Sequence, residues 1–152
     1  VAAKNPSRNI ETLRDCTWQD LDDVKSEVSA EDIQRATFVL GEKDRVLGVC
    51  EALVAGDYEK VGELMYATHQ GLSKDYEVSC EELDYLNDIA KECGVTGSRI
   101  MGGGFGGCTI NLVKDELYDN FIATAKQKFN AKYGHEPKVY DVVIGRGSHK
   151  IA

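Results

Sequence analysis

Paired cysteines and clustered histidines are absent from this chain of 152 residues. The five cysteines are an odd number, lie far apart and form no C-x-x-C pair, and the three histidines are equally scattered. Such spacing provides neither a disulfide framework nor the ligand set of a zinc site. We therefore expect free thiols, a cytoplasmic location and no metal ligands in this chain.

Long apolar runs and an excess of basic residues are also absent. The sequence has no stretch of about 18 consecutive apolar residues, and its first residues contain no apolar core of a signal peptide. Aspartate and glutamate number 26 against 18 for lysine and arginine, which gives a formal charge of -8 at pH 7. These features argue against a membrane partner and against a dedicated nucleic-acid binder.

Proline is scarce, with two residues in the chain, and no repeat or low-complexity stretch separates one part from another. Hydrophobic residues make up 42% and charged residues 29% of the composition, as in ordinary globular proteins. We expect residues 1–152 to form a single α+β domain. Because the sequence begins with valine and not methionine, we also expect a processed chain, a trimmed one or a piece of a longer protein.

The first 90 or so residues have helical periodicity, with apolar residues three and four positions apart. Ser29 is expected to cap a long helix that ends at Gly56. A second helix should begin near Tyr58. Ser79 and Glu82 have the spacing of a capping box, which predicts the start of a third helix.

Strand-like segments follow in the last third of the sequence. Residues 98–101 and 108–113 flank a glycine-rich stretch, and the second of them is short and β-branched, which predicts two strands joined by a glycine turn. Apolar residues four positions apart predict a helix over 115–133, and residues 138–145 predict a last strand. The expected fold is a helical N-terminal half followed by β-β-α-β. This last part is half of the split βαβ pattern of ferredoxin-like sheets.

Glycine is concentrated between the two expected strands. Five of the fifteen glycines lie within six positions, interrupted by one aromatic residue: Gly102, Gly103, Gly104, Phe105, Gly106 and Gly107. A tight hairpin needs about two glycines. The excess indicates that a ligand or another part of the backbone approaches the main chain closely, as in anion-binding nests. The alternative is a hairpin whose glycines serve packing alone.

Two phosphate-binding motifs fail in this context. The pattern G-x-G-x-x-G opens a helix in dinucleotide-binding domains, whereas this stretch continues as a strand. A Walker A loop requires a lysine at the position of Cys108. A Rossmann site and a P-loop are both excluded.

The stretch from Ser98 to Thr109, SRIMGGGFGGCT, resembles the third conserved motif of galactokinases, members of the GHMP small-molecule kinase superfamily. A weaker stretch, Gly41-Glu42-x-x-Arg45-Val46, also resembles that family. A third stretch resembles the galactokinase segment that precedes the glycine motif, at His69, Leu72, Asp75, Tyr76, Val78, Ser79, Cys80, Glu82, Leu83 and Asp84.

The resemblance implies the C-terminal domain of a GHMP kinase. Galactokinases transfer the γ-phosphoryl group of ATP to the anomeric hydroxyl of galactose, with Mg²⁺, and give galactose 1-phosphate. In the family the glycine motif lies at the cleft between two domains. By that resemblance, the residues that would bind the cofactor ATP, or lie near the sugar, are Gly102, Gly103, Gly104, Phe105, Gly106 and Gly107.

Other parts of the galactokinase pattern do not occur in this sequence. The first motif, which ends in Gly-Glu-His-x-Asp, and the second, a Gly-Leu-Ser-Ser-Ser phosphate loop, are missing. The family's catalytic aspartate, its arginine partner and its sugar-contacting tyrosine have no counterpart. We therefore assign no catalytic residue and no metal ligand here, expect an N-terminal catalytic domain outside this sequence, and expect the isolated chain to be inactive.

Two further functions remain open from the sequence. One is a stand-alone module of βαβ type that senses a small ligand or mediates an interaction, with the glycine stretch binding a small anion. The other is a related kinase that acts on another sugar, because the residues that choose the sugar would lie in the missing domain.

Overall fold

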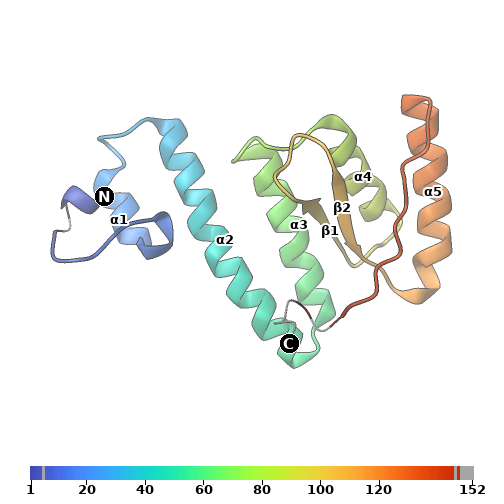
Figure 1. Cartoon of the computed structure of the whole chain (residues 1–152), viewed down its shortest axis with the longest axis horizontal. Helices are drawn as coiled ribbons and strands as arrows, with labels where there is room; N and C mark the ends of the chain where they lie inside the picture. The colour runs from blue at the N-terminus through green and yellow to red at the C-terminus, as the bar shows by residue number, and fades with distance from the viewer. Residues whose placement is uncertain (5, 146, 148–152) are drawn as a thin grey trace, which may run out of the picture.

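The computed structural model describes residues 1–4, 6–145 and 147. Helices dominate the first part of the chain, and a two-stranded sheet with one more helix follows, as expected for an α+β fold (Figure 1). The elements in order are two 3-10 helices, Ala2–Lys4 and Leu13–Asp15, then α1 (Trp18–Val24), α2 (Ala30–Ala55), α3 (Tyr58–Lys74), α4 (Glu81–Glu92), β1 (Gly97–Met101), β2 (Cys108–Leu112) and α5 (Asp115–Tyr133).

Three of the predicted helix boundaries are confirmed. The Ser29 side chain accepts a hydrogen bond from the N–H of Asp32 and caps α2. Gly56 ends α2 in the left-handed conformation, at φ 72°, which costs glycine nothing. Tyr58 then begins α3.

The predicted capping box at α4 is wrong. The helix begins one residue later than that pattern requires, with Cys80 at the N-cap and no side-chain cap. The hydroxyl of Ser79 donates instead to the carboxylate of Asp84, at 2.5 Å. A hydrogen bond to an ionised carboxylate is stronger than one between Ser79 and a neutral backbone amide, so the serine pairs with Asp84.

The two predicted strands pair antiparallel, in a register that runs from Gly97 opposite Leu112 to Met101 opposite Cys108. Helix α3 crosses β1 at very short range. A Cβ atom added to Gly62 would lie 1.8 Å from the carbonyl oxygen of Thr96, and one added to Gly97 would lie 2.6 Å from the Cα atom of Gly62. The helix and the strand approach this closely because neither has a side chain at the contact.

A small apolar core joins the sheet end of the molecule to α5. Its buried members come from α4, from the turn after it and from α5; they are Ile89, Ala90, Val95, Phe121 and Ala125. Helices α4 and α5 pack side by side (Figure 1). The glycine stretch lies between the end of β1 and the start of β2.

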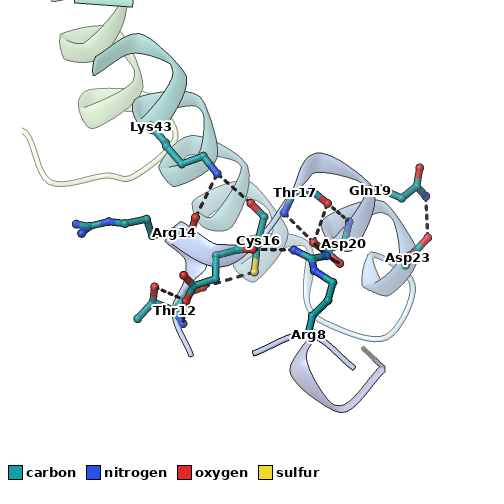
Figure 2. A network of polar contacts seen from close by, with 10 residues as sticks. Arg8, Thr12, Arg14, Cys16, Thr17, Gln19, Asp20, Asp23 and Lys43 are labelled. Carbon is teal, nitrogen blue, oxygen red and sulfur yellow. Dashed lines mark hydrogen bonds and ion pairs between the residues drawn. The ribbon is translucent and has the colours of Figure 1, made fainter. Parts of the chain in front are cut away.

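The N-terminal segment packs on the first half of α2 through a separate core of Cys16, Leu21 and Leu40. Figure 2 shows the polar contacts that surround this core. The ammonium group of Lys43 on α2 donates to the carbonyl oxygens of Arg14, at 3.2 Å, and Cys16, at 3.1 Å. The segment is therefore fixed to α2 by both apolar and polar contacts.

The predicted last strand, residues 138–145, is wrong. These residues form no strand in the described part of the chain, and Val142, Val143 and Ile144 are 75–96% exposed. The segment runs back along α5 (Figure 1), where the hydroxyl of Tyr118 donates to Asp141. A helix offers no ladder of backbone partners, so β-branched residues alone do not make a strand. In the described residues the order is β1, β2 and α5, with a two-stranded sheet and without the last strand of the expected β-β-α-β pattern.

Candidate functional site

The glycine loop, residues 102–107, connects β1 to β2 in a conformation that ordinary residues avoid. Positive φ angles occur at Gly102 (94°), Gly104 (84°), Gly106 (126°) and Gly107 (99°), and also at Phe105 (57°). The backbone of residues other than glycine rarely adopts these angles. The concentration of glycine in the sequence is therefore required by the backbone path of this loop.

One side of the glycine loop rests on another part of the backbone. A Cβ atom at Gly104 would lie 2.2 Å from the carbonyl oxygen of Val78, and the N–H of Phe105 donates to that same oxygen at 2.7 Å. Val78 belongs to the connector, residues 75–80, between α3 and α4. The close approach expected from the sequence is thus, at Gly104, a contact with the main chain of the connector.

The other side of the glycine loop is open. Among the described residues, no atom lies within 4 Å of the position that a Cβ would take at Gly102, Gly103 or Gly106. Within the same set, Phe105 is the loop residue whose N–H donates to another backbone carbonyl. A glycine surface that is open in this way gives room for the oxygens of a phosphate or a sugar to approach the main chain. The Phe105 side chain is 77% exposed.

The connector is fixed by a group of four polar side chains, which we call the Asp84 cluster: His69, Ser73, Ser79 and Asp84. Ser79 and Ser73 donate to the carboxylate of Asp84, at 2.5 Å and 2.8 Å. Nε2 of His69 lies 3.1 Å from the same carboxylate. The cluster therefore links α3, the connector and α4.

Electrostatics assign the protonation states in the Asp84 cluster. Burial alone would raise the pKa of Asp84, but the hydrogen bonds from Ser79 and Ser73 outweigh it and the pKa is lowered. Burial lowers the pKa of His69, against the opposing charge of Asp84. A neutral His69 therefore donates through Nε2 to an ionised Asp84. Nδ1 of His69 is buried and has no partner among the described residues.

An open depression of about 450 Å³ lies over the Asp84 cluster. Its lining includes the carboxylates of Glu77, Glu81 and Asp84 against the single ammonium group of Lys74. Glu77 and Glu81 also form ion pairs, with Arg35 at 3.4 Å and Lys132 at 2.7 Å, so these two carboxylates are partly neutralised, while that of Asp84 accepts hydrogen bonds from serines. The glycine loop, and not this depression, is the candidate anion site.

A metal ion finds no ready ligand set in this part of the protein. The described residues contain no group of three or more histidine, cysteine, aspartate or glutamate side chains placed to hold one. Among the same residues, no helix is long and apolar enough to cross a membrane.

Sequence reasoning found the glycine loop but gave no role to the residues that support it. Val78, His69 and Asp84 stood in the galactokinase-like stretch without a function, and Ser73 was missed. The spacing of His69 and Ser73 is a usable signal, because residues four apart on a helix share one face. That both would point to a carboxylate on α4 depends on the packing of the two helices and is not visible in the sequence.

Family comparison covers both the glycine loop and the Asp84 cluster. The family model of the C-terminal part of GHMP kinases ("GHMP kinases C terminal") matches residues 50–131. The chain belongs to the family of GHMP kinase C-terminal domains. The matched residues contain α3, α4, both strands and most of α5, so the family's characteristic part is the half of the molecule that carries the site.

Individual members of the GHMP kinases agree with this assignment. A galactokinase from Clostridium beijerinckii is 40% identical over 146 residues, which cover 95% of this chain and 38% of that protein. The crystal structure of Lactococcus lactis galactokinase complexed with galactose matches with a TM-score of 0.77 and 32% identity, over 88% of this chain and 35% of that one. A structure of L. major mevalonate kinase in complex with R-mevalonate matches with a TM-score of 0.58 and 25% identity, over 72% and 33%. The chain thus spans 33–38% of the length of these GHMP kinases.

Proposed function

We propose that residues 1–152 form a single domain that acts as the C-terminal part of a galactokinase, an enzyme that transfers the γ-phosphoryl group of ATP to galactose. The observation that supports this most is the glycine loop, which lies inside the GHMP kinase match and is open beside Gly102, Gly103 and Gly106. Similarity to galactokinases over 95% of the chain supports the choice of sugar over other GHMP substrates.

In this proposal the glycine loop binds and orients. The amides of Gly102, Gly103 and Gly106 donate to phosphate or sugar oxygens, and Gly104 keeps the loop close to the connector. Phosphoryl transfer depends mainly on positioning and on neutralising charge, for which fixed backbone dipoles are suited. Bound ATP supplies the phosphoryl group and Mg²⁺ offsets its charge. We place the metal ligands and the catalytic residues in sequence beyond this chain.

A stand-alone ligand-sensing module is the weaker alternative. It would explain the glycine loop but not the similarity to galactokinases that extends through α2 and the N-terminal segment. We also propose a cytoplasmic location. All five cysteines are free thiols, as is usual in a reducing compartment.

The test is a galactokinase assay on the longer protein that contains this chain, with ATP, Mg²⁺ and galactose. We expect galactose 1-phosphate from the longer protein and none from residues 1–152 alone. Gly104→Val should lower kcat/KM by about 100-fold, because the side chain would displace the loop from Val78. Gly145→Val is the matched control, since no described atom lies within 4 Å of its Cβ position.

Three results would contradict the proposal. One is turnover by residues 1–152 alone, and another is full activity of Gly104→Val in a protein that remains folded. The third is phosphorylation of a different sugar while galactose is left unchanged, which would assign the chain to a kinase of that sugar.

A further inference from the structure

The glycine loop rests on the connector, so the path of the connector determines where the loop lies. The N–H of Phe105 donates to the carbonyl oxygen of Val78, and Gly104 approaches the same residue so closely that an added Cβ would lie 2.2 Å from that oxygen. The connector is not regular structure. Glu77 has a positive φ of 58°, and the N–H of Val78 donates back to the carbonyl of Leu72 at 2.9 Å. Backbone hydrogen bonds hold part of its path, and the side chain of Ser79 adds a further contact, to Asp84.

The side-chain contacts between the connector, α3 and α4 meet at the carboxylate of Asp84. One of its oxygens accepts from Ser79, the residue directly after Val78, at 2.5 Å. The other accepts from Ser73 near the end of α3, at 2.8 Å. The carboxylate thus joins the end of α3 to the connector, while its own main chain lies in α4. Hydrogen bonds to an ionised acceptor are about twice as strong as neutral ones.

His69 makes the arrangement sensitive to the loss of that carboxylate. The residue is 4% exposed, and its Nε2 has Asp84 as its partner at 3.1 Å. Its Nδ1 is already buried without a partner among the described residues. Without Asp84, both ring nitrogens would be buried and unpaired, which a folded protein avoids by moving the surrounding chain.

We propose that Asp84 is a positioning residue for the glycine loop: it fixes the connector through Ser79 and Ser73, and the connector's Val78 carbonyl in turn fixes Gly104 and Phe105. The role of the loop in substrate binding rests on the proposed function. The positioning itself does not, and it is tested separately below.

The first experiment measures hydrogen exchange of the Phe105 amide in the longer protein, without substrates. This amide reports on its hydrogen bond to Val78 directly. In Asp84→Asn its exchange should become about 10-fold to 100-fold faster, the effect of losing hydrogen bonds to a charged group. Amides of the α4–α5 core, such as that of Ala125, should exchange at the unaltered rate.

A second pair of variants isolates the connector. Ser79→Ala removes one of the hydroxyl donors to Asp84 and should also speed exchange at Phe105, by a smaller factor. Ser79→Thr retains a hydroxyl and should restore slow exchange. The matched controls are Asp119→Asn and Ser26→Ala, exposed residues of α5 and of the turn after α1, which should leave exchange at Phe105 unchanged.

The same variants are then assayed for galactose phosphorylation. Asp84→Asn should lower kcat about 10-fold with the KM for galactose within about twofold, because the sugar is held mainly by the remainder of the enzyme. If the unaltered protein shows no galactokinase activity, the proposed function fails while the exchange experiment still decides the role of Asp84.

Two outcomes would overturn the positioning role. One is unchanged exchange at Phe105 in folded Asp84→Asn and Ser79→Ala. The other is equal acceleration at Phe105 and throughout the α4–α5 core, which would make Asp84 a general stabilising residue. If Asp84→Asn does not fold, the contrast between Ser79→Ala and Ser79→Thr decides alone.

Discussion

Two carboxylates, the buried Asp20 in the first half of the molecule and the half-buried Asp84 in the second, organise their surroundings in different ways. Asp20, at the start of α1, accepts from the N–H and the hydroxyl of Thr17, both at 2.7 Å, and from the guanidinium of Arg8 (Figure 2). All its partners lie within 12 residues in sequence. Asp84 instead gathers donors from α3 and the connector. In both places a carboxylate accepts several hydrogen bonds. At Asp20 these bonds stabilise the start of α1, and at Asp84 they hold the connector on which the glycine loop rests.

The backbones of the two halves also pack differently. Around β1, α3 and the strand meet through glycine at Gly62 and Gly97, and the glycine loop meets the connector at Gly104. The second half of α2 instead exposes apolar side chains, with Val46, Leu47 and Val54 between 58% and 91% exposed. The close main-chain contacts thus lie from α3 onward, inside the GHMP kinase match, and little substitution is tolerated there.

The largest expected effect on stability is at the contact between α3 and β1. Gly62→Ala should lower the free energy of unfolding of this chain by about 3 kcal/mol, because its Cβ would overlap the carbonyl of Thr96. Urea unfolding followed by circular dichroism measures this. Gly48→Ala on α2 is the control: its Cβ would meet only the end of the Leu64 side chain, at 3.3 Å. A loss at Gly48 as large as that at Gly62 would remove the contrast between the halves.

A moderate effect is expected at Asp20, and it depends on pH. Hydrogen bonds from the backbone and side chain of Thr17, and then from Arg8, lower the pKa of Asp20 to about 2 from an ordinary value of 3.8. A lowered pKa in the folded state means that the ionised form is stabilised by folding. That stabilisation is complete above about pH 4 and is lost as the pH falls toward 2.

Asp20→Asn should therefore lower Tm at pH 7, and the difference from the unaltered chain should shrink as the pH falls from 5 to 2. Thermal unfolding at a series of pH values measures this. Asp119→Asn, which changes an exposed carboxylate, should show no such trend. Activity of the longer protein should be unaffected by Asp20→Asn, and a kcat loss as large as that of Asp84→Asn would contradict the separation of the two carboxylates.

The smallest expected effect on stability is at the side chain of Phe105. Its ring is 77% exposed and its contact with Val78 is made by the backbone, so Phe105→Ala should leave Tm unchanged. A change in the KM for ATP at constant Tm would show that the ring itself contacts the ligand. A clear fall in Tm would mean that the ring, and not the amide, holds the loop to the connector.

Much of this fold follows from local sequence, and the exceptions share one cause. Ser29, Gly56 and Tyr58 marked helix boundaries correctly because capping and left-handed turns are decided by adjacent residues. The strand predicted at residues 138–145 was wrong because pairing needs a partner far away in the sequence. Ser79 was misread as a cap because its competing acceptor, Asp84, becomes available only when the helix is in place.

The glycine loop was visible in the sequence for a related reason. The contact with Val78 requires a glycine at position 104. The glycine can be read from the sequence even when its contact partner is unknown. What the sequence did not show is that Val78 makes that contact. The candidate ligand residues were therefore predictable, while their support was not.

The most direct measurement of the central claim is amide exchange across the glycine loop of the longer protein, with and without saturating ATP, Mg²⁺ and galactose. The account predicts slower exchange at Gly102, Gly103 and Gly106, whose surroundings are open, and little change at Phe105, which is already bonded to Val78. Protection elsewhere in the protein with every loop amide unchanged would show that the ligands bind away from the glycine loop, and would contradict the account.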